Sequence, residues 1–114
     1  EVIAGEAGKA TYNDPVLTRR LAERWSKELG SGNVQKAEPV MVSEDFGDLG
    51  LDRQIPISLF WLGTIDPAVV AKYKAEGKTL PALHSSLFAP LPPPTIMTGV
   101  KAMTLAVWEL LAVK

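Results

Sequence analysis

The sequence contains no cysteine and only one histidine among its 114 residues. The lack of cysteine excludes a disulfide framework and a thiolate metal site, although it does not indicate the cellular compartment. Long apolar runs are also missing, because Lys101 and Glu109 interrupt the longest candidate, 96–113, which argues against a membrane span. The 12 basic and 13 acidic residues give a net charge of -1 without basic clusters, so we expect neither nucleic acid nor an anionic membrane as a partner.

The sequence does contain enough apolar material for one packed domain. Apolar residues make up 46% of the chain and the mean hydropathy is +0.09, which excludes disorder as the default state. The first residues, EVIAGEAGKATYNDP, show neither an initiating methionine nor a signal-peptide pattern. They are typical of the interior of a longer polypeptide, and the localisation is therefore not indicated.

Two segments carry the start and stop signals of helices. Asp14 and Pro15 suit the cap and the first position of a helix over 15–29, and Gly30 suits its end. Apolar residues recur every four positions along this segment and define one face: Leu17, Leu21, Trp25 and Leu29. The segment 66–77 has the same Asp-Pro start and glycine end, so it predicts a second, short helix.

Two short apolar runs, 37–43 and 57–63, are bounded by proline or glycine and contain β-branched or aromatic residues. Neither run alternates between apolar and polar positions, which favours strands covered on both faces in the sheet of an α/β protein. A third run, 2–4, predicts a strand end or a linker. The expected fold is an incomplete part of a mixed-sheet α/β domain, in the order β-α-β-β-α-loop-α, because this chain is too short to build a wide sheet alone.

The last part of the chain predicts a stiff connector followed by a buried helix. Consecutive prolines in APLPPPT favour an extended backbone, and Thr95 can cap the helix that comes after them. Apolar residues cover much of this helix, so we expect it to be largely buried. Its apolar face consists of Ile96, Met97, Val100, Met103, Val107, Trp108, Leu110 and Leu111.

His84 is the first candidate for chemistry, and it lies in the turn-like stretch ALHSSLFAP. A neutral imidazole nitrogen is a common ligand of zinc and similar metals, and binding residues often lie on loops. The alternative interpretation is an exposed or hydrogen-bonded loop residue without a chemical role.

The second candidate is the stretch SEDFG, in which Ser43, Glu44 and Asp45 come after a predicted strand. Ligands bind outside the carboxyl ends of strands in open α/β sheets, and two acids placed there suit a metal, a water or a cationic group. The two acids could instead solvate a turn and cap the next residues of the chain. Glycine-rich phosphate loops and the GxSxG motif are absent.

Five segments resemble one family in their order and spacing. They are NDPVLTRRLAERWSKELG, PVMVSEDFG, ISLFWLGTIDP, LPALHSSLFAP and PPTIMTGVKAMTLAVWELL. The chain resembles the carboxyl-terminal part of the catalytic domain of amidohydrolases related to hippurate hydrolase, N-acyl-amino-acid amidohydrolases and carboxypeptidases, within the aminoacylase-type two-metal peptidases. The resemblance covers nearly the whole chain, and SEDF and LHS are among its most specific elements.

The resemblance implies that residues 1–13 end an inserted lid or dimerisation domain and that 14–114 complete a metallohydrolase catalytic domain. It implies two zinc ions, with manganese or cobalt as alternatives, and a homo-oligomeric parent that hydrolyses an N-acyl-amino-acid or peptide amide. His84 corresponds to the last metal-ligating histidine of the family. The loops beside the active site contain Ser43, Glu44, Asp45 and Ser85.

The other ligands and the glutamate general base of the family lie upstream, and none of their motifs occurs in this sequence. A catalytic metal needs about three protein ligands and an open position for water, so the resemblance implies a fragment that is inactive alone. We expect such a fragment to self-associate through sheet edges and apolar faces. Ser86 stands where the family more often has proline, which should alter the stiffness of the loop. The alternative is a self-sufficient, non-catalytic α/β binding or structural domain.

Overall fold

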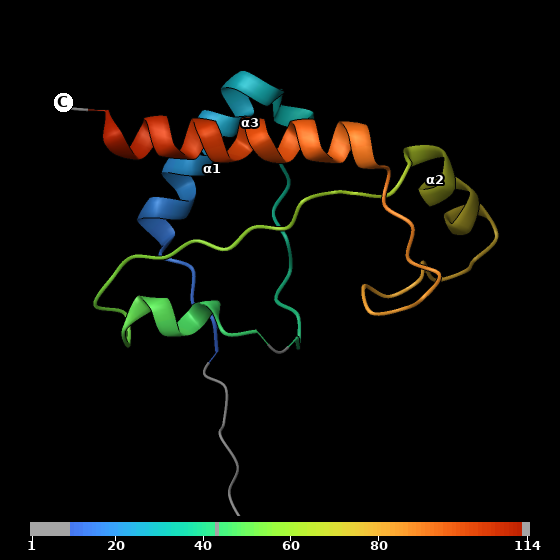
Figure 1. Cartoon of the computed structure of the whole chain (residues 1–114), viewed down its shortest axis with the longest axis horizontal. Helices are drawn as coiled ribbons and strands as arrows, with labels where there is room; N and C mark the ends of the chain where they lie inside the picture. Colours follow the sequence, from blue (N-terminus) through green and yellow to red (C-terminus); the bar gives the residue numbers. More distant parts are fainter. Residues whose placement is uncertain (1–9, 43, 113–114) are drawn as a thin grey trace, which may run out of the picture. The chain divides into compact units, whose positions relative to one another are not determined.

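The computed structural model describes residues 10–42 and 44–112, and within these ranges the chain is helical (Figure 1). It forms the α-helices α1 (Pro15–Leu29), α2 (Pro67–Ala75) and α3 (Pro92–Leu111), and the short 3-10 helices η1 (Ser31–Asn33) and η2 (Phe46–Gly50). The predicted mixed-sheet α/β fold is wrong, because the described ranges contain no β-strand. The predicted strand end at 2–4 lies outside them, and the predicted domain boundary after residue 13 stays a prediction.

The two apolar runs that predicted strands are irregular chain over residues 37–42 and 57–63, and residue 43 lies outside the described ranges. A strand needs a neighbour that accepts and donates its backbone hydrogen bonds, and apolar content alone does not supply one. In the first run the side chains of Val40, Met41 and Val42 are exposed rather than covered on both faces. The expectation of burial is wrong here because the described part of the chain places no second strand beside this run.

The backbone of the second run, 57–63, is hydrogen-bonded to the residues that precede α1. The Asn13 Nδ2 donates to the Leu59 carbonyl and the Leu59 N–H donates to Asn13 Oδ1, both at 2.7 Å. The Asp14 N–H donates to the Ile57 carbonyl at 2.8 Å. The Asn13 side chain therefore bonds both backbone groups of Leu59, as a residue of a paired strand would. These bonds satisfy backbone groups that would otherwise need a strand or water.

The predicted helix over 15–29 is confirmed as α1. Asp14 Oδ1 accepts from the Leu17 N–H at 2.7 Å, and Pro15 occupies the first position, where its missing N–H costs nothing. Gly30 ends the helix with a φ of 93°, a conformation that side chains disfavour. The helix buries Leu21 and Trp25, two members of the predicted apolar face.

The predicted helix over 66–77 is confirmed as α2. Asp66 Oδ1 accepts from the Ala68 N–H at 2.8 Å and therefore caps the helix. Gly77 comes shortly after its end with a φ of 62°. These local signals predicted both helices because capping bonds and glycine stops act within a few residues of sequence.

The third helix begins at Pro92 rather than after a cap at Thr95. The prediction of an extended connector is therefore wrong for residues 92–95, which are helical. The three prolines fit the first turn of α3, where backbone N–H groups have no acceptor inside the helix. The Thr95 N–H donates to the Leu91 carbonyl at 3.3 Å, which closes the first turn. Thr95 is therefore an internal residue of the helix.

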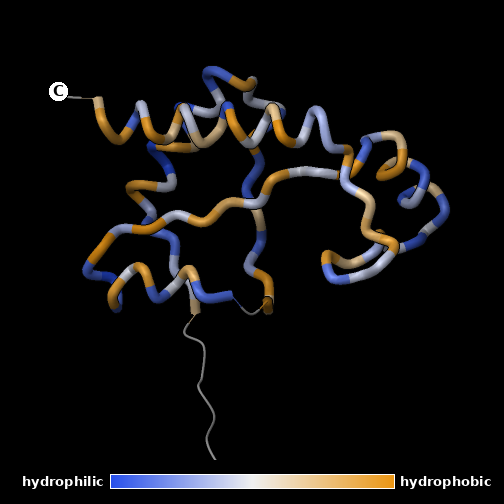
Figure 2. The backbone as a smooth tube through the Cα atoms, viewed as in Figure 1, coloured by the Kyte–Doolittle hydropathy of each residue, from blue (hydrophilic) through white to orange (hydrophobic). Residues whose placement is uncertain are grey.

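The expected burial of the large apolar residues of α3 is also wrong. All eight residues of the predicted apolar face are exposed, and the buried residues are Ala102, Leu105 and Ala106, at 4%, 8% and 8% exposure. Apolar residues recur along the whole length of this helix (Figure 2), so the pattern could not decide which side the rest of the chain covers. Among the described helices, none combines the length and apolar content needed to cross a bilayer.

The chain separates into two compact units. The unit formed by Glu1–Trp61 and Leu105–Lys114 has its core between α1 and the end of α3. Its buried apolar side chains are Leu21, Trp25, Leu105 and Ala106. The Phe60 ring lies against Trp25 with a centroid separation of 4.7 Å and an interplanar angle of 51°. Arg20 Nε is 2.6 Å from Glu109 Oε1, which joins the two helices at the edge of this core.

The unit Leu62–Thr104 contains α2, the His84 turn and the first part of α3. The Leu91 N–H donates to the Thr64 carbonyl at 2.7 Å, which ties the chain before α3 to the segment before α2. A Cβ at Gly99 would lie 3.2 Å from Leu62 Cδ2, so the glycine leaves room for this leucine against the helix.

Truncating Leu21 tests the core between the helices. Leu21→Ala should lower the free energy of unfolding by about 2–5 kcal/mol, because the side chain is 5% exposed and leaves a cavity. Val16→Ala, on the same helix at 72% exposure, is the matched control and should change stability by less than about 0.5 kcal/mol. Urea denaturation followed by circular dichroism measures both, and equal losses would contradict the assigned core.

Candidate functional site

His84 lies on a turn whose shape is held by its neighbour Ser85. The Ser85 N–H donates to the Ala82 carbonyl at 2.9 Å, and the Ser85 carbonyl accepts from the Phe88 N–H at 3.0 Å. The Ser85 Oγ accepts from the Leu87 N–H at 3.1 Å. His84 itself is exposed. The turn therefore presents the imidazole at the surface on a backbone that does not depend on it.

Glu44 holds the start of η2. Its Oε2 accepts from the Phe46 N–H at 2.8 Å, and its Oε1 accepts from the Thr11 hydroxyl. Asp45 is exposed at the N-cap of η2, and its side chain makes no capping bond. The interpretation of Glu44 as a cap for the next residues of the chain agrees with these contacts, since both carboxylate oxygens are engaged. Ser43 lies outside the described residues.

The predicted site residues fall into two groups. Glu44 and Asp45 are neighbours in the Glu1–Trp61 segment, whereas His84 and Ser85 share a turn in the Leu62–Thr104 unit. In the part of the chain that the structure describes, no group of three or more His, Asp or Glu side chains is arranged to hold a metal ion. His84 is thus a candidate ligand without a complete ligand set among these residues.

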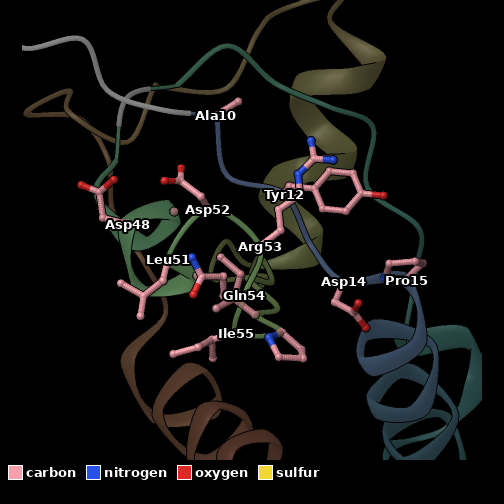
Figure 3. A pocket seen from close by; sticks show the side chains of 14 residues that line it. Ala10, Tyr12, Asp14, Pro15, Asp48, Leu51, Asp52, Arg53, Gln54 and Ile55 are labelled. Atoms are coloured by element: carbon pink, nitrogen blue, oxygen red, sulfur yellow. The ribbon is translucent and has the colours of Figure 1, made fainter.

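The structure also shows a concavity that the sequence did not reveal. It has a volume of about 660 Å³ and lies between the segment that leads into α1 and the segment after η2 (Figure 3). The Arg53 guanidinium lies over the Tyr12 ring at 4.1 Å from the centroid, a cation–π contact that joins the two walls. The carboxylates of Asp48 and Asp52 lie on one side of this concavity.

Three consecutive residues in this wall have left-handed backbone conformations. The φ angles of Leu51, Asp52 and Arg53 are 44°, 54° and 70°. Each costs about 1–2 kcal/mol relative to the right-handed form. The turn is closed by two backbone bonds, from the Gln54 N–H to the Leu51 carbonyl at 3.2 Å and from the Ile55 N–H to the Gly50 carbonyl at 3.0 Å. No residue of this run is glycine, so no sequence signal marked it beyond the tolerance of aspartate for this conformation.

Comparison with protein-family models, curated proteins and solved structures finds no match for this chain. Its function must therefore be inferred from the residues and their geometry.

Measuring the free energy of unfolding of alanine variants distinguishes the structural role of Glu44 from that of Asp45. Glu44→Ala should lower the free energy of unfolding by about 1–2 kcal/mol, because the Phe46 N–H and the Thr11 hydroxyl lose their acceptor. Asp45→Ala removes a neighbouring exposed carboxylate and should change stability by less than about 0.5 kcal/mol. Thermal and urea denaturation of both variants measure the difference. An undiminished stability of Glu44→Ala would show that its bonds do not hold η2.

Proposed function

We propose that this chain contributes one ligand, His84, to the metal centre of an amidohydrolase that cleaves an N-acyl-amino-acid or peptide amide. The remaining ligands and the general base come, in this proposal, from polypeptide other than the described residues. The observation that carries the proposal is the exposed imidazole on the turn that Ser85 stabilises. The five sequence segments that resemble the two-metal amidohydrolases support the reaction class.

The residues present fit a metal at a single position. Imidazole nitrogen is a preferred ligand of zinc and also suits manganese or cobalt, and His84 is exposed to an incoming ion. Glu44 fits less well, because Thr11 and Phe46 already occupy its oxygens. When bound, divalent metal ions would polarise the amide carbonyl and lower the pKa of an attacking water.

In this proposal, the task of the chain is to position the imidazole of His84. The bonds of Ser85 to Ala82, Leu87 and Phe88 hold the turn without using the histidine ring. A turn held by its own hydrogen bonds reduces the conformational entropy that ligation would otherwise cost. Ser85 is accordingly a positioning residue rather than a ligand in this proposal.

A second candidate function is a non-catalytic binding or structural domain. Exposed apolar side chains on one helix favour it, because Trp108 and Leu111, three residues apart on α3, are 62% and 73% exposed. Such surfaces mark contacts with other macromolecules when they are contiguous. This candidate requires no role for His84, so variants of that residue distinguish the two.

The chain by itself should not bind zinc tightly. Isothermal titration with ZnCl₂ should show no stoichiometric binding, because one imidazole supplies too few ligands for a stable site. Any weak binding should disappear in His84→Ala and persist in Ser86→Ala, which changes an exposed residue of the same turn. Tight binding that survives His84→Ala would contradict the single-ligand assignment.

In the complete hydrolase, His84→Ala should remove most of the activity. We expect kcat for an N-acyl amino acid to fall by about 100-fold or more, since changes even to the groups around metal ligands cost 10–100-fold. Ser86→Ala should retain activity, and circular dichroism of both variants should match the wild type. Near-normal turnover of a folded His84→Ala protein would refute the proposed role and favour the binding domain.

A further inference from the structure

The concavity beside η2 combines an arginine, two aspartates and apolar side chains within one compact unit. All of its lining residues lie between positions 10 and 57, inside the Glu1–Trp61 segment. Its volume of about 660 Å³ falls in the range of small-molecule sites, roughly 300–1,000 Å³. The role proposed for His84 uses none of these residues.

Arg53 is the residue of the concavity that favours an anionic group. Its guanidinium lies over the Tyr12 ring at 4.1 Å from the centroid. A cation–π contact forms no hydrogen bond, so the N–H donors of the guanidinium stay available for a bidentate bond with a carboxylate. In the part of the chain that the structure describes, Arg53 makes no ion pair and its side chain donates no hydrogen bond. Tyr12 therefore positions a guanidinium whose donors are open.

The backbone that carries Arg53 is held in a tight turn. Residues 51–53 are all left-handed, and two backbone bonds close the turn, with the N–H groups of Gln54 and Ile55 as donors. Residues other than glycine that are held in such conformations cluster at ligand sites, where the local cost is part of a preorganised geometry. A closed turn also lowers the conformational entropy that Arg53 would lose when a ligand binds.

The opposite charge lies on the other side of the concavity. The carboxylates of Asp48 and Asp52 lie away from the Tyr12 ring and the Arg53 guanidinium (Figure 3). These two charges repel a dianion such as phosphate and attract an ammonium group. Apolar side chains, among them Leu51, belong to the same lining. The charges and the apolar surface together favour a ligand with a positive end, a negative end and an aliphatic middle.

We infer that the concavity binds a zwitterion whose carboxylate and ammonium lie at opposite ends of an aliphatic chain. The carboxylate accepts from the N–H groups of Arg53, the ammonium donates to Asp48, and the aliphatic chain lies on Leu51 and Ile55. An α-amino acid has both charges on one carbon, so it is a poorer match for groups on opposite sides. A free ω-amino acid has the required arrangement. A lysine at the carboxyl terminus of a peptide offers the same chemistry from a second source.

Titration of the ¹⁵N-labelled chain with 6-aminohexanoate, followed by the amide chemical shifts, tests this inference. Shift changes should be confined to residues 10–15 and 47–57, with a Kd of about 1 mM. Hexanoate lacks the ammonium and hexylamine lacks the carboxylate. Each should bind about tenfold more weakly or worse, because one charged hydrogen bond is lost. EDTA in all samples removes metal ions.

Variants of the two charged ends provide a second readout. Arg53→Gln should raise the Kd of 6-aminohexanoate about tenfold or more, and Asp48→Asn should raise it by a similar factor. Arg19→Gln changes an exposed arginine of α1 outside the concavity, so it is the matched control and should keep the wild-type Kd. Circular dichroism of the three variants should match the wild type, since all three residues are exposed.

Nα-acetyl-L-lysine, which represents a carboxyl-terminal lysine, distinguishes the two sources. Tighter binding than 6-aminohexanoate identifies a peptide terminus, and weaker binding identifies a free ω-amino acid. The absence of shift changes at about 20 mM 6-aminohexanoate, twentyfold above the expected Kd, would overturn the inference. Hexanoate binding as tightly as 6-aminohexanoate, or an unchanged Kd in Arg53→Gln, would overturn it as well. These results do not depend on metal binding or hydrolysis, so the proposed function is tested separately.

Discussion

Two consecutive residues, Asn13 and Asp14, hold together the unit that contains α1. Asn13 bonds both backbone groups of Leu59 through its side chain, while Asp14 caps α1 and donates its own N–H to Ile57. Because these bonds align the start of α1 with the segment 57–60, the Phe60 ring meets Trp25 in the core. The concavity lies nearby, between residues 10–15 and residues 47–57. One amide side chain thus bonds both backbone groups of Leu59, as a residue of a neighbouring strand would.

The two candidate sites differ in how their side chains relate to the backbone. Glu44 uses its carboxylate to bond Phe46 and Thr11, so its chemistry and the integrity of η2 are coupled. His84 lies on a turn that Ser85 stabilises. The hydrogen bonds that hold this turn do not involve the imidazole of His84. This separation of support from function is what a ligand-bearing loop on a rigid scaffold requires. It makes His84 the better candidate for chemistry.

The helix α3 shows why apolar content and burial are different quantities. Small residues and one leucine face the chain, whereas the larger aliphatic and aromatic residues face water. Burial of apolar area is favourable in water, and large contiguous apolar patches mark contact sites on proteins.

The sequence by itself determined α1 and α2, because caps at Asp14 and Asp66 and glycines after each helix act over a few residues. It also predicted a helix near the end of the chain but misplaced its start, since prolines fit both an extended connector and a first turn. The ligand role of His84 stays a prediction. Only the tertiary structure decided that the apolar runs are not strands, that 51–53 are left-handed and which side of α3 is covered. The reason is physical: a cap is a contact between near neighbours in sequence, whereas strand pairing and burial depend on which distant segment lies alongside.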